Sequence, residues 1–204
     1  SDWDHATSDL QGAINTSGVT KVLVATGNYN VGSSSFVMKN GVEIYGGFDP
    51  DNGISTLNDD RILPNETAFE GSVLNGKNER PVVWNFDNAL NNTAVLDGFT
   101  LKNGSSANGG AMYNGGSSPT LSNLWIKANT ATADGGAIYN VNSSSPVMTN
   151  ITIEGNTANY GGGIFNRNSS SPVMTNVIIK NNTANNDGGA MYNDVSASPQ
   201  LTNV

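Results

Sequence analysis

The C-terminal half of the chain repeats one sequence pattern at an almost constant interval. The copies open with Gly-Gly pairs that are 26, 26 and 27 residues apart, at Gly109, Gly135, Gly161 and Gly188. A fixed period in this range is typical of solenoids, in which each copy forms one coil and stacks on its neighbours. The repeat therefore predicts a rod built from stacked coils, and many local motifs in it have an architectural explanation.

Apolar residues recur in matching columns of the copies. An apolar, variable, apolar order, as at Leu124–Ile126, is the period-two pattern of a strand with one buried face. Each copy is expected to hold about three short strands, separated by Gly, Asn and Ser-Pro. Parallel stacking about 4.8 Å apart would bury the apolar columns. The sequence therefore predicts an all-β, right-handed parallel β-helix with three sheets and about 26 residues per coil.

Composition supports this fold class and excludes several functions. Asn is the commonest residue, ahead of 24 Gly, and both are poor helix formers. The net charge of −8 argues against nucleic acid and anionic membranes as main partners. The chain has no Cys and a single His, so disulfides, thiolate metal sites and His-based triads are not expected. No apolar run reaches the roughly 18–20 residues of a membrane span.

Three columns of the repeat consist of Asn. Asn tolerates left-handed backbone, and stacked amides form hydrogen-bonded ladders. We therefore interpret all three columns as structural. Asn123, Asn150, Asn176 and Asn203 lie between the second and third strands. The other columns are Asn114, Asn140, Asn166 and Asn193, and Asn129, Asn156 and Asn182.

One charged and one aromatic column complete the pattern. Lys127, Glu154 and Lys180 are expected to stack on an outer face with alternating sign. The aromatic column has two interpretations: a ladder of self-stacked rings, or an aromatic strip that binds sugar rings. Its members, the candidate ligand-binding residues, are Tyr113, Tyr139, Phe165 and Tyr192.

Residues 1–20 are expected to form an N-terminal cap. Ser8 and Gln11 are spaced as a capping box, with Ser8 as the N-cap. The short amphipathic helix that follows would lie across the first coil and hide its open edge, with Trp3 beneath it. Its apolar face consists of Leu10, Ala13 and Ile14.

Residues 21–108 are interpreted as irregular coils of the same solenoid. The strand Lys21–Ala25 is expected to run into a turn at Thr26–Tyr29, and Val42–Phe48 to form another strand. Val95–Asn103 aligns with Leu121–Asn129 as a degenerate coil, with Gly98 at the Asn123 position. The whole chain, 1–204, is thus expected to be one β-helix domain of roughly seven or eight coils. Its regular repeats occupy 109–204, where the last copy is incomplete, and we expect the native chain to continue.

An acidic excursion from one coil is expected at residues 49–80. In the stretch Asp49–Gly53, Asp49 and Asp51 place alternate oxygen ligands before a glycine, as in a Ca²⁺ loop. The remaining ligands and the distal Glu of such a loop are missing, so a solvated turn is the competing interpretation. No other cofactor is expected. Asp59-Asp60-Arg61 is interpreted as a local ion pair.

The front half resembles the front of secreted bacterial right-handed parallel β-helix repeat proteins. The resemblance rests on Asp9–Gln11 with Ala13-Ile14, Val24–Tyr29, Glu43–Phe48 and Val95–Thr100. Gly135–Ile138 and Phe165–Asn168 also resemble the GGAI and FxxN repeats of polymorphic outer-membrane proteins. Such proteins are mostly exported to the bacterial cell surface and often adhesin-like. The resemblance implies an extracellular location, and export and anchoring machinery that acts through segments outside this chain.

The expected function is that of a non-catalytic, exported cell-surface module, a stalk or adhesin that binds a surface glycan or protein. A polysaccharide lyase or hydrolase that uses acids of residues 49–97 is one alternative. In the repeats, Asp134 and Asp187 have matching turn positions about 10 Å apart, with Tyr160 between them. No Asp or Glu flanks them, so no catalytic residue is predicted. A structural subunit that assembles end-to-end through open strand edges is the other alternative.

Overall fold

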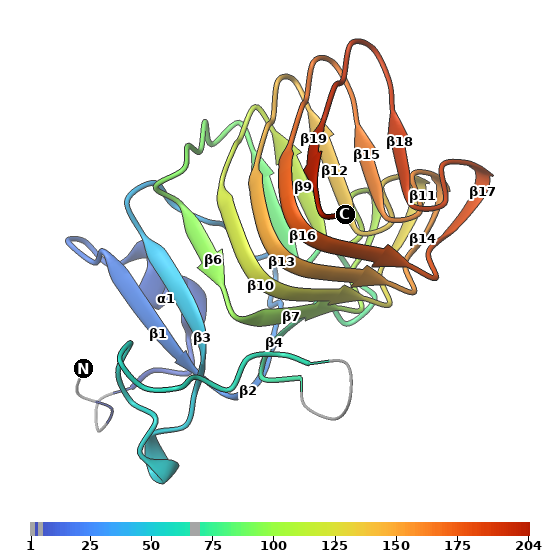
Figure 1. Cartoon of the computed structure of the whole chain (residues 1–204). Helices are drawn as coiled ribbons and strands as arrows, with labels where there is room; N and C mark the ends of the chain where they lie inside the picture. The colour runs from blue at the N-terminus through green and yellow to red at the C-terminus, as the bar shows by residue number, and fades with distance from the viewer. Residues whose placement is uncertain (1–2, 4–5, 66–69) are drawn as a thin grey trace.

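Three parallel sheets wind around one core in the computed structural model, which describes residues 3, 6–65 and 70–204. In the largest sheet, each coil adds a strand beside that of the coil before it (Figure 1). The order is β1 (Lys21–Ala25), β3 (Glu43–Phe48), β6 (Val95–Asp97), β10 (Thr120–Lys127), β13 (Val147–Glu154), β16 (Val173–Lys180) and β19 (Gln200–Thr202). The prediction of a parallel three-sheet solenoid with coils of about 26 residues is confirmed.

The two smaller sheets close the other sides of the rod. One contains β5 (Val83–Phe86), β9 (Met112–Gly115), β12 (Ile138–Val141), β15 (Ile164–Asn166) and β18 (Met191–Asn193). The other contains β8 (Ser105–Asn108), β11 (Thr130–Asp134), β14 (Thr157–Tyr160) and β17 (Thr183–Asp187). A third sheet was predicted, but its repeat strands were not located in the sequence, because each of them buries only one small apolar residue, such as Ala131 or Ala158.

The strand pattern within a coil differs from the expected one. The second and third predicted strands are one eight-residue strand that bends at an Asn, as β13 does at Asn150. Asn150 has a φ of 54°, and pairing with β16 resumes immediately beyond it. The left-handed residue turns the chain through a corner without ending the ladder.

The apolar columns have the expected register. Met148 opposes both Leu121 and Met174, and all three are completely buried. Burial of each such side chain stabilises the fold by about 1.5–3 kcal/mol. Because the same contact recurs at every coil, the core is a continuous rod of stacked side chains.

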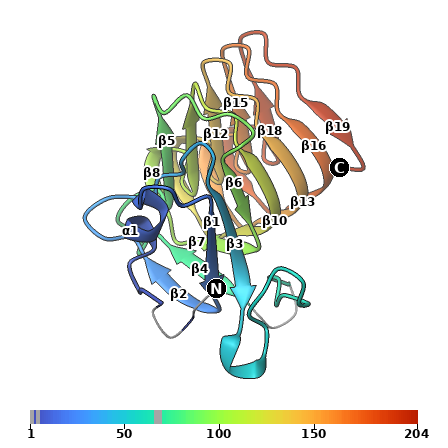
Figure 2. The same cartoon turned by 90° about the vertical axis from the view of Figure 1, so that its left-hand side faces the viewer.

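The N-terminal cap contains the helix α1 (Leu10–Asn15), which lies beside β1 at the front of the rod (Figure 2). The prediction of Ser8 as the N-cap is wrong: Asp9 has this position, and its carboxylate accepts the Gly12 amide hydrogen. Gln11 hydrogen-bonds both backbone groups of Val37 instead of closing a capping box. Leu10 and Ile14 join the core, as expected.

Trp3 packs against the acidic excursion. Its ring lies 5.8 Å from that of Phe48, and its indole nitrogen donates to the Ser55 carbonyl. The excursion leaves the first sheet after β3 and returns at β4 (Ser72–Asn75). This strand pairs with β2 (Gly27–Asn30) and β7 (Phe99–Lys102). Residues 72–80 therefore already belong to the coil, although the sequence suggested an excursion over 49–80.

Two further expectations for the front half are corrected. Thr26–Tyr29 is not a turn: the chain bends at Thr26 and continues as β2 (Gly27–Asn30). The degenerate coil is offset by one residue, because Val95 opposes Thr120 rather than Leu121. Its second segment is β7 (Phe99–Lys102), and Gly98 keeps the corner position with a φ of 81°.

Candidate functional site

Ladders of Asn amides run along the inside of the rod. Asn114, Asn140 and Asn166 are completely buried, and each amide nitrogen donates to the amide oxygen of the next coil at 2.8–2.9 Å. The ladder begins one coil earlier than predicted, at Asn85, which donates to Asn114 at 3.0 Å. A second interior ladder joins Asn129, Asn156 and Asn182 at 2.9 Å per step. The structural interpretation of both columns is therefore confirmed.

The corner column forms a ladder on the outside of the rod. Here the donor is always in the later coil: Asn150 donates to Asn123 at 3.3 Å, and Asn203 donates to Asn176 at 2.8 Å. Asn123 in turn donates to Asp97 at 2.8 Å, so the ladder begins on a carboxylate. All four residues of the column have left-handed backbone, with φ between 51° and 54°.

Two serine ladders, which the sequence analysis missed, hold the Ser-Pro corners. The hydroxyl of Ser118 accepts from the Ser145 amide at 2.9 Å, and that of Ser145 accepts from the Ser171 amide at 3.0 Å. Ser144 and Ser170 continue the buried neighbouring column. The Ser-Ser-Pro stretch in each copy was the available signal. These contacts explain the stretch as architecture.

The charged column has the predicted register but different partners. Glu154 lies between Lys127 and Lys180 in the sheet and pairs with Lys180 at 3.4 Å. Lys127 instead pairs with Glu70 of the excursion at 2.7 Å and lies 3.6 Å from the centre of the Trp125 ring. Because Lys102 contacts the same Glu70, one carboxylate joins the excursion to two successive coils.

The aromatic column is a stacked ladder. Successive ring centres of Tyr113, Tyr139, Phe165 and Tyr192 are 5.2, 5.4 and 5.2 Å apart. The central rings are largely buried, with 6% of Tyr139 and 3% of Phe165 exposed. Neighbouring rings cover the faces on which a sugar would stack, so a sugar could contact only the edges of these rings. Sugar binding along this strip stays a prediction.

The ladder also extends one coil further than predicted, to Trp84, which stacks on Tyr113 at 4.3 Å. The shared aromatic-Asn pair of Trp84-Asn85 and Tyr113-Asn114 was a usable signal. It was missed because this coil lacks the Gly-Gly opening of the repeats.

The repeat acids lie near the aromatic ladder. Asp134 and Asp187 both oppose Tyr160, as predicted, so they are two strands apart. Burial raises the pKa of Asp134, nearby Asp194 adds to this effect, and Arg167 opposes it. Arg167 pairs with Asp194 at 3.4 Å. This arrangement is an ion pair beside a half-buried acid.

The candidate Ca²⁺ ligands lie in a short turn. Pro50–Asn52 forms a 3-10 turn, Gly53 closes it with a φ of 83°, and Asp49 accepts from the Asn52 amide at 2.9 Å. Among the described residues, no group of three or more His, Cys, Asp or Glu side chains could hold a metal ion. Ca²⁺ binding by Asp49 and Asp51 stays a prediction.

Arg61 connects the excursion to the coils, and its predicted local ion pair is wrong. Its guanidinium contacts Asp97, 36 residues away, at 2.5 Å and donates to the Gly46 carbonyl at 3.0 Å. The two side chains are 15% and 9% exposed. Asp59 instead accepts the amide hydrogens of Ser55 and Thr56, which hold the pKa of Asp59 below its usual range. Asp97 therefore fixes the excursion to the coils, and Asp59 fixes a turn within the excursion.

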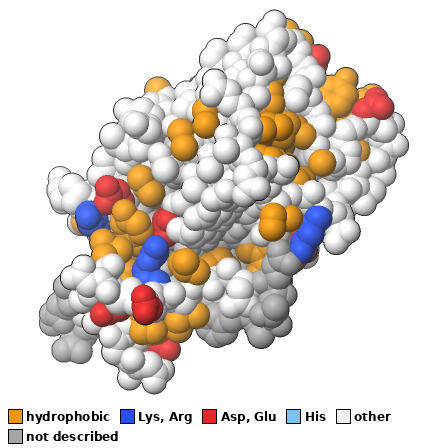
Figure 3. Space-filling view, in the orientation of Figure 1, with side chains coloured by type: hydrophobic (Ala, Val, Ile, Leu, Met, Phe, Trp, Pro, Cys, Tyr) orange, Lys and Arg blue, Asp and Glu red, His pale blue; other side chains and the backbone are white. Residues whose placement is uncertain are grey.

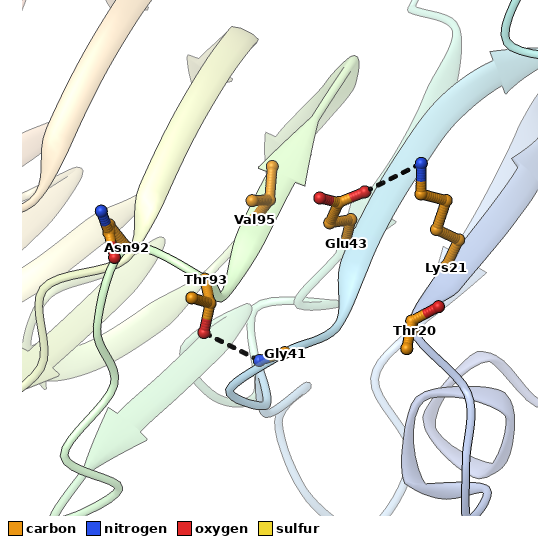
Figure 4. Close-up of a pocket in the computed structure, with 7 residues that line it drawn as sticks. All are labelled: Thr20, Lys21, Gly41, Glu43, Asn92, Thr93 and Val95. Carbon is orange, nitrogen blue, oxygen red and sulfur yellow. Dashed lines mark hydrogen bonds and ion pairs between the residues drawn. The ribbon is translucent and has the colours of Figure 1, made fainter.

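A shallow cavity of about 280 Å³ crosses the outer ends of β1, β3 and β6 (Figure 4). Lys21 and Glu43 pair across it at 3.3 Å, and Thr93 accepts the Gly41 amide hydrogen at its rim. Four of its seven lining residues are thus already engaged in two pairs with each other. Among the described residues, no helix is long and apolar enough to cross a membrane.

Comparison with known proteins identifies a repeat family that the chain is similar to. The model of the Chlamydia polymorphic membrane protein repeat matches residues 126–141 and 150–167, which cover parts of three consecutive copies of the repeat. No curated protein and no solved structure matches the chain. The matched segments contain the Gly-Gly-Ala-Ile and Phe-Asn stretches together with the buried Asn ladder. The chain is therefore a parallel β-helix repeat protein whose coils are similar to the Chlamydia polymorphic membrane protein repeat.

Proposed function

We propose that the chain is a non-catalytic, cell-surface β-helix module that acts as a stiff stalk or adhesin. The observation that carries this proposal is the continuity of the rod. Interior amide ladders, aromatic stacking and apolar columns occupy the repeat residues that recur at each coil. In a solenoid each coil stacks on its neighbours, so the length of the rod grows with the number of coils. Such a rod can hold a binding surface at a fixed distance from the cell and in a fixed orientation.

The match to the polymorphic membrane protein repeat supports the surface location. Antibodies raised against residues 109–204 should label intact cells of the source organism, and externally added protease should remove the label. Labelling that requires permeabilised cells would contradict the location. A cytoplasmic protein labelled in parallel reports whether the cells are intact.

The non-catalytic part of the proposal has a separate test. We expect no release of reducing or unsaturated ends from neutral and acidic polysaccharides, with or without Ca²⁺. If turnover were found, Asp97→Asn, Asp134→Asn and Asp187→Asn would identify the acid responsible. Any such release by the purified chain would overturn this part of the proposal and favour the polysaccharide-active enzyme.

A further inference from the structure

The aromatic ladder ends at β5 in two rings that other side chains leave open. Trp84 stacks on Tyr113, and Phe86 meets the same Tyr113 ring edge-on at 5.8 Å. Within the described residues, no ring stacks on the side of Trp84 away from Tyr113. Trp84 is 36% exposed and Phe86 40%, several times more than the rings inside the ladder.

The neighbouring coil leaves room for this pair. A Cβ atom at Gly115 would lie 2.7 Å from the Phe86 ring and 2.9 Å from the Tyr113 ring. Glycine at this position thus leaves room for the Phe86 ring to lie over β9. In the next two coils the matching position is occupied by Val141 and Arg167, which have side chains. The backbone amide of Trp84 is already bonded to the Phe36 carbonyl at 2.9 Å. A ligand would therefore meet side chains rather than add a strand.

Polar groups lie beside the open rings. Asp87 is exposed, and its charge adds to the effect of burial and of Tyr139 in raising the pKa of Tyr113. A carboxylate and a phenol thus border two aromatic surfaces. This combination suits a pyranose ring, whose C–H face packs on an aromatic side chain while its hydroxyls donate to a carboxylate. The carboxylate and the net charge of −8 disfavour sugars that carry an acid.

The size of the surface also favours a small ring as ligand. A stable protein interface buries about 800 Å² on each partner. Two aromatic side chains bury about 150–250 Å² each when fully covered, and these two are already more than half covered. We infer that Trp84, Phe86 and Asp87 bind a neutral hexopyranose at the end of a surface glycan. The inference rests on the proposed surface role for its biological setting and adds the ligand class.

The test is direct binding of neutral oligosaccharides to the purified chain. Glucose-, mannose- and galactose-based hexasaccharides are titrated at up to millimolar concentration, with an oligogalacturonide as the acidic counterpart. We expect one neutral series to bind and to shift the NMR signal of the Trp84 indole N–H. We expect Trp84→Ala to weaken this binding about tenfold or more and Trp84→Phe to retain part of it. Ile178→Ala, an exposed apolar change on another sheet, should leave binding unchanged.

Several outcomes would overturn the inference. They are no binding of any neutral series, binding of the oligogalacturonide alone, or equal affinities of the wild type and Trp84→Ala. If Trp84→Ala fails to fold, Trp84→Phe and the indole signal of the wild type still decide whether the ligand contacts this ring. Labelling of intact cells is scored separately. A failure of glycan binding therefore leaves the stalk proposal standing, and a failure of labelling leaves the binding result standing.

Discussion

The repeats at 109–204 and the coils at 21–108 share the largest sheet, but different contacts hold them together. In the repeats, each contact of Asn140 or Met148 is made again one coil away. In the front half, single contacts join distant segments, such as Arg61 to Asp97 and Gln11 to Val37. Most charged side chains visible in Figure 3 also lie over the front half. Periodic sequence thus provides redundancy, whereas irregular sequence depends on contacts that no neighbouring coil duplicates.

The largest expected effect comes from breaking the contact between the excursion and the coils. Asp97→Ala leaves the Arg61 guanidinium, which is only 15% exposed, without its carboxylate. Removing one partner of a buried ion pair costs about 3–5 kcal/mol. We expect urea unfolding to report this loss and hydrogen exchange to rise first in β1 and β3. Asp51→Ala, an exposed acid of the same excursion, should change stability by less than about 0.5 kcal/mol. Uniform exchange along the whole rod would contradict this distinction between the halves.

A change inside the repeats should cost somewhat less. Asn140→Ala removes the acceptor of the Asn114 amide nitrogen and the donor to the Asn166 amide oxygen, and both of these groups are buried. Each unsatisfied group costs about 1–3 kcal/mol, so we expect a loss of about 2–4 kcal/mol in urea unfolding. A loss no greater than that of Asn150→Ala would show that the interior ladder contributes nothing beyond the corner ladder.

The corner ladder should contribute less, chiefly through backbone conformation. Asn150 is exposed and has a φ of 54°, which alanine adopts at a cost of about 1 kcal/mol. We expect thermal unfolding of Asn150→Ala to show this loss. Asn150→Gly should remain within a few tenths of a kcal/mol of the wild type. Equal losses in both variants would instead assign the effect to the amide bonds.

The smallest expected effect is a pH-dependent one at the junction of the two regions. Burial raises the pKa of Glu70, but the hydrogen bonds and charges of Lys102 and Lys127 outweigh this and leave it below its usual value. A lowered folded pKa stabilises the protein above the unfolded value of about 4.3, and the contribution is lost as pH falls further. Glu70 is one-third exposed, so we expect less than about 1 kcal/mol. The free energies of unfolding of the wild type and Glu70→Gln, measured in urea, should differ at pH 7 and converge near pH 3. A difference that stays constant with pH would refute this origin.

The fold was predictable because neighbours in space are neighbours in the repeat alignment. The repeat spacing alone predicts that Met148 and Met174 are neighbours, and it predicts the Asn columns in the same way. Arg61 and Asp97 share no period, so the sequence favoured the adjacent acids of Asp59-Asp60-Arg61. The strand Thr157–Tyr160 was missed because Ala158 is a weak apolar signal. Trp84 was missed because its coil lacks the Gly-Gly opening from which the repeats were counted.

The interior and exterior Asn ladders have opposite orientations, and together they give the rod a net dipole along its axis. In both interior ladders the amide nitrogen of the earlier coil donates to the later one, whereas in the corner ladder the later coil donates. Amide dipoles that point the same way along a column add together. Two columns in the low-dielectric core and the exposed columns of opposite direction do not cancel, since solvent screens the outer ones. The stack is therefore polarised along its axis, and its two ends present unlike potentials to whatever approaches them.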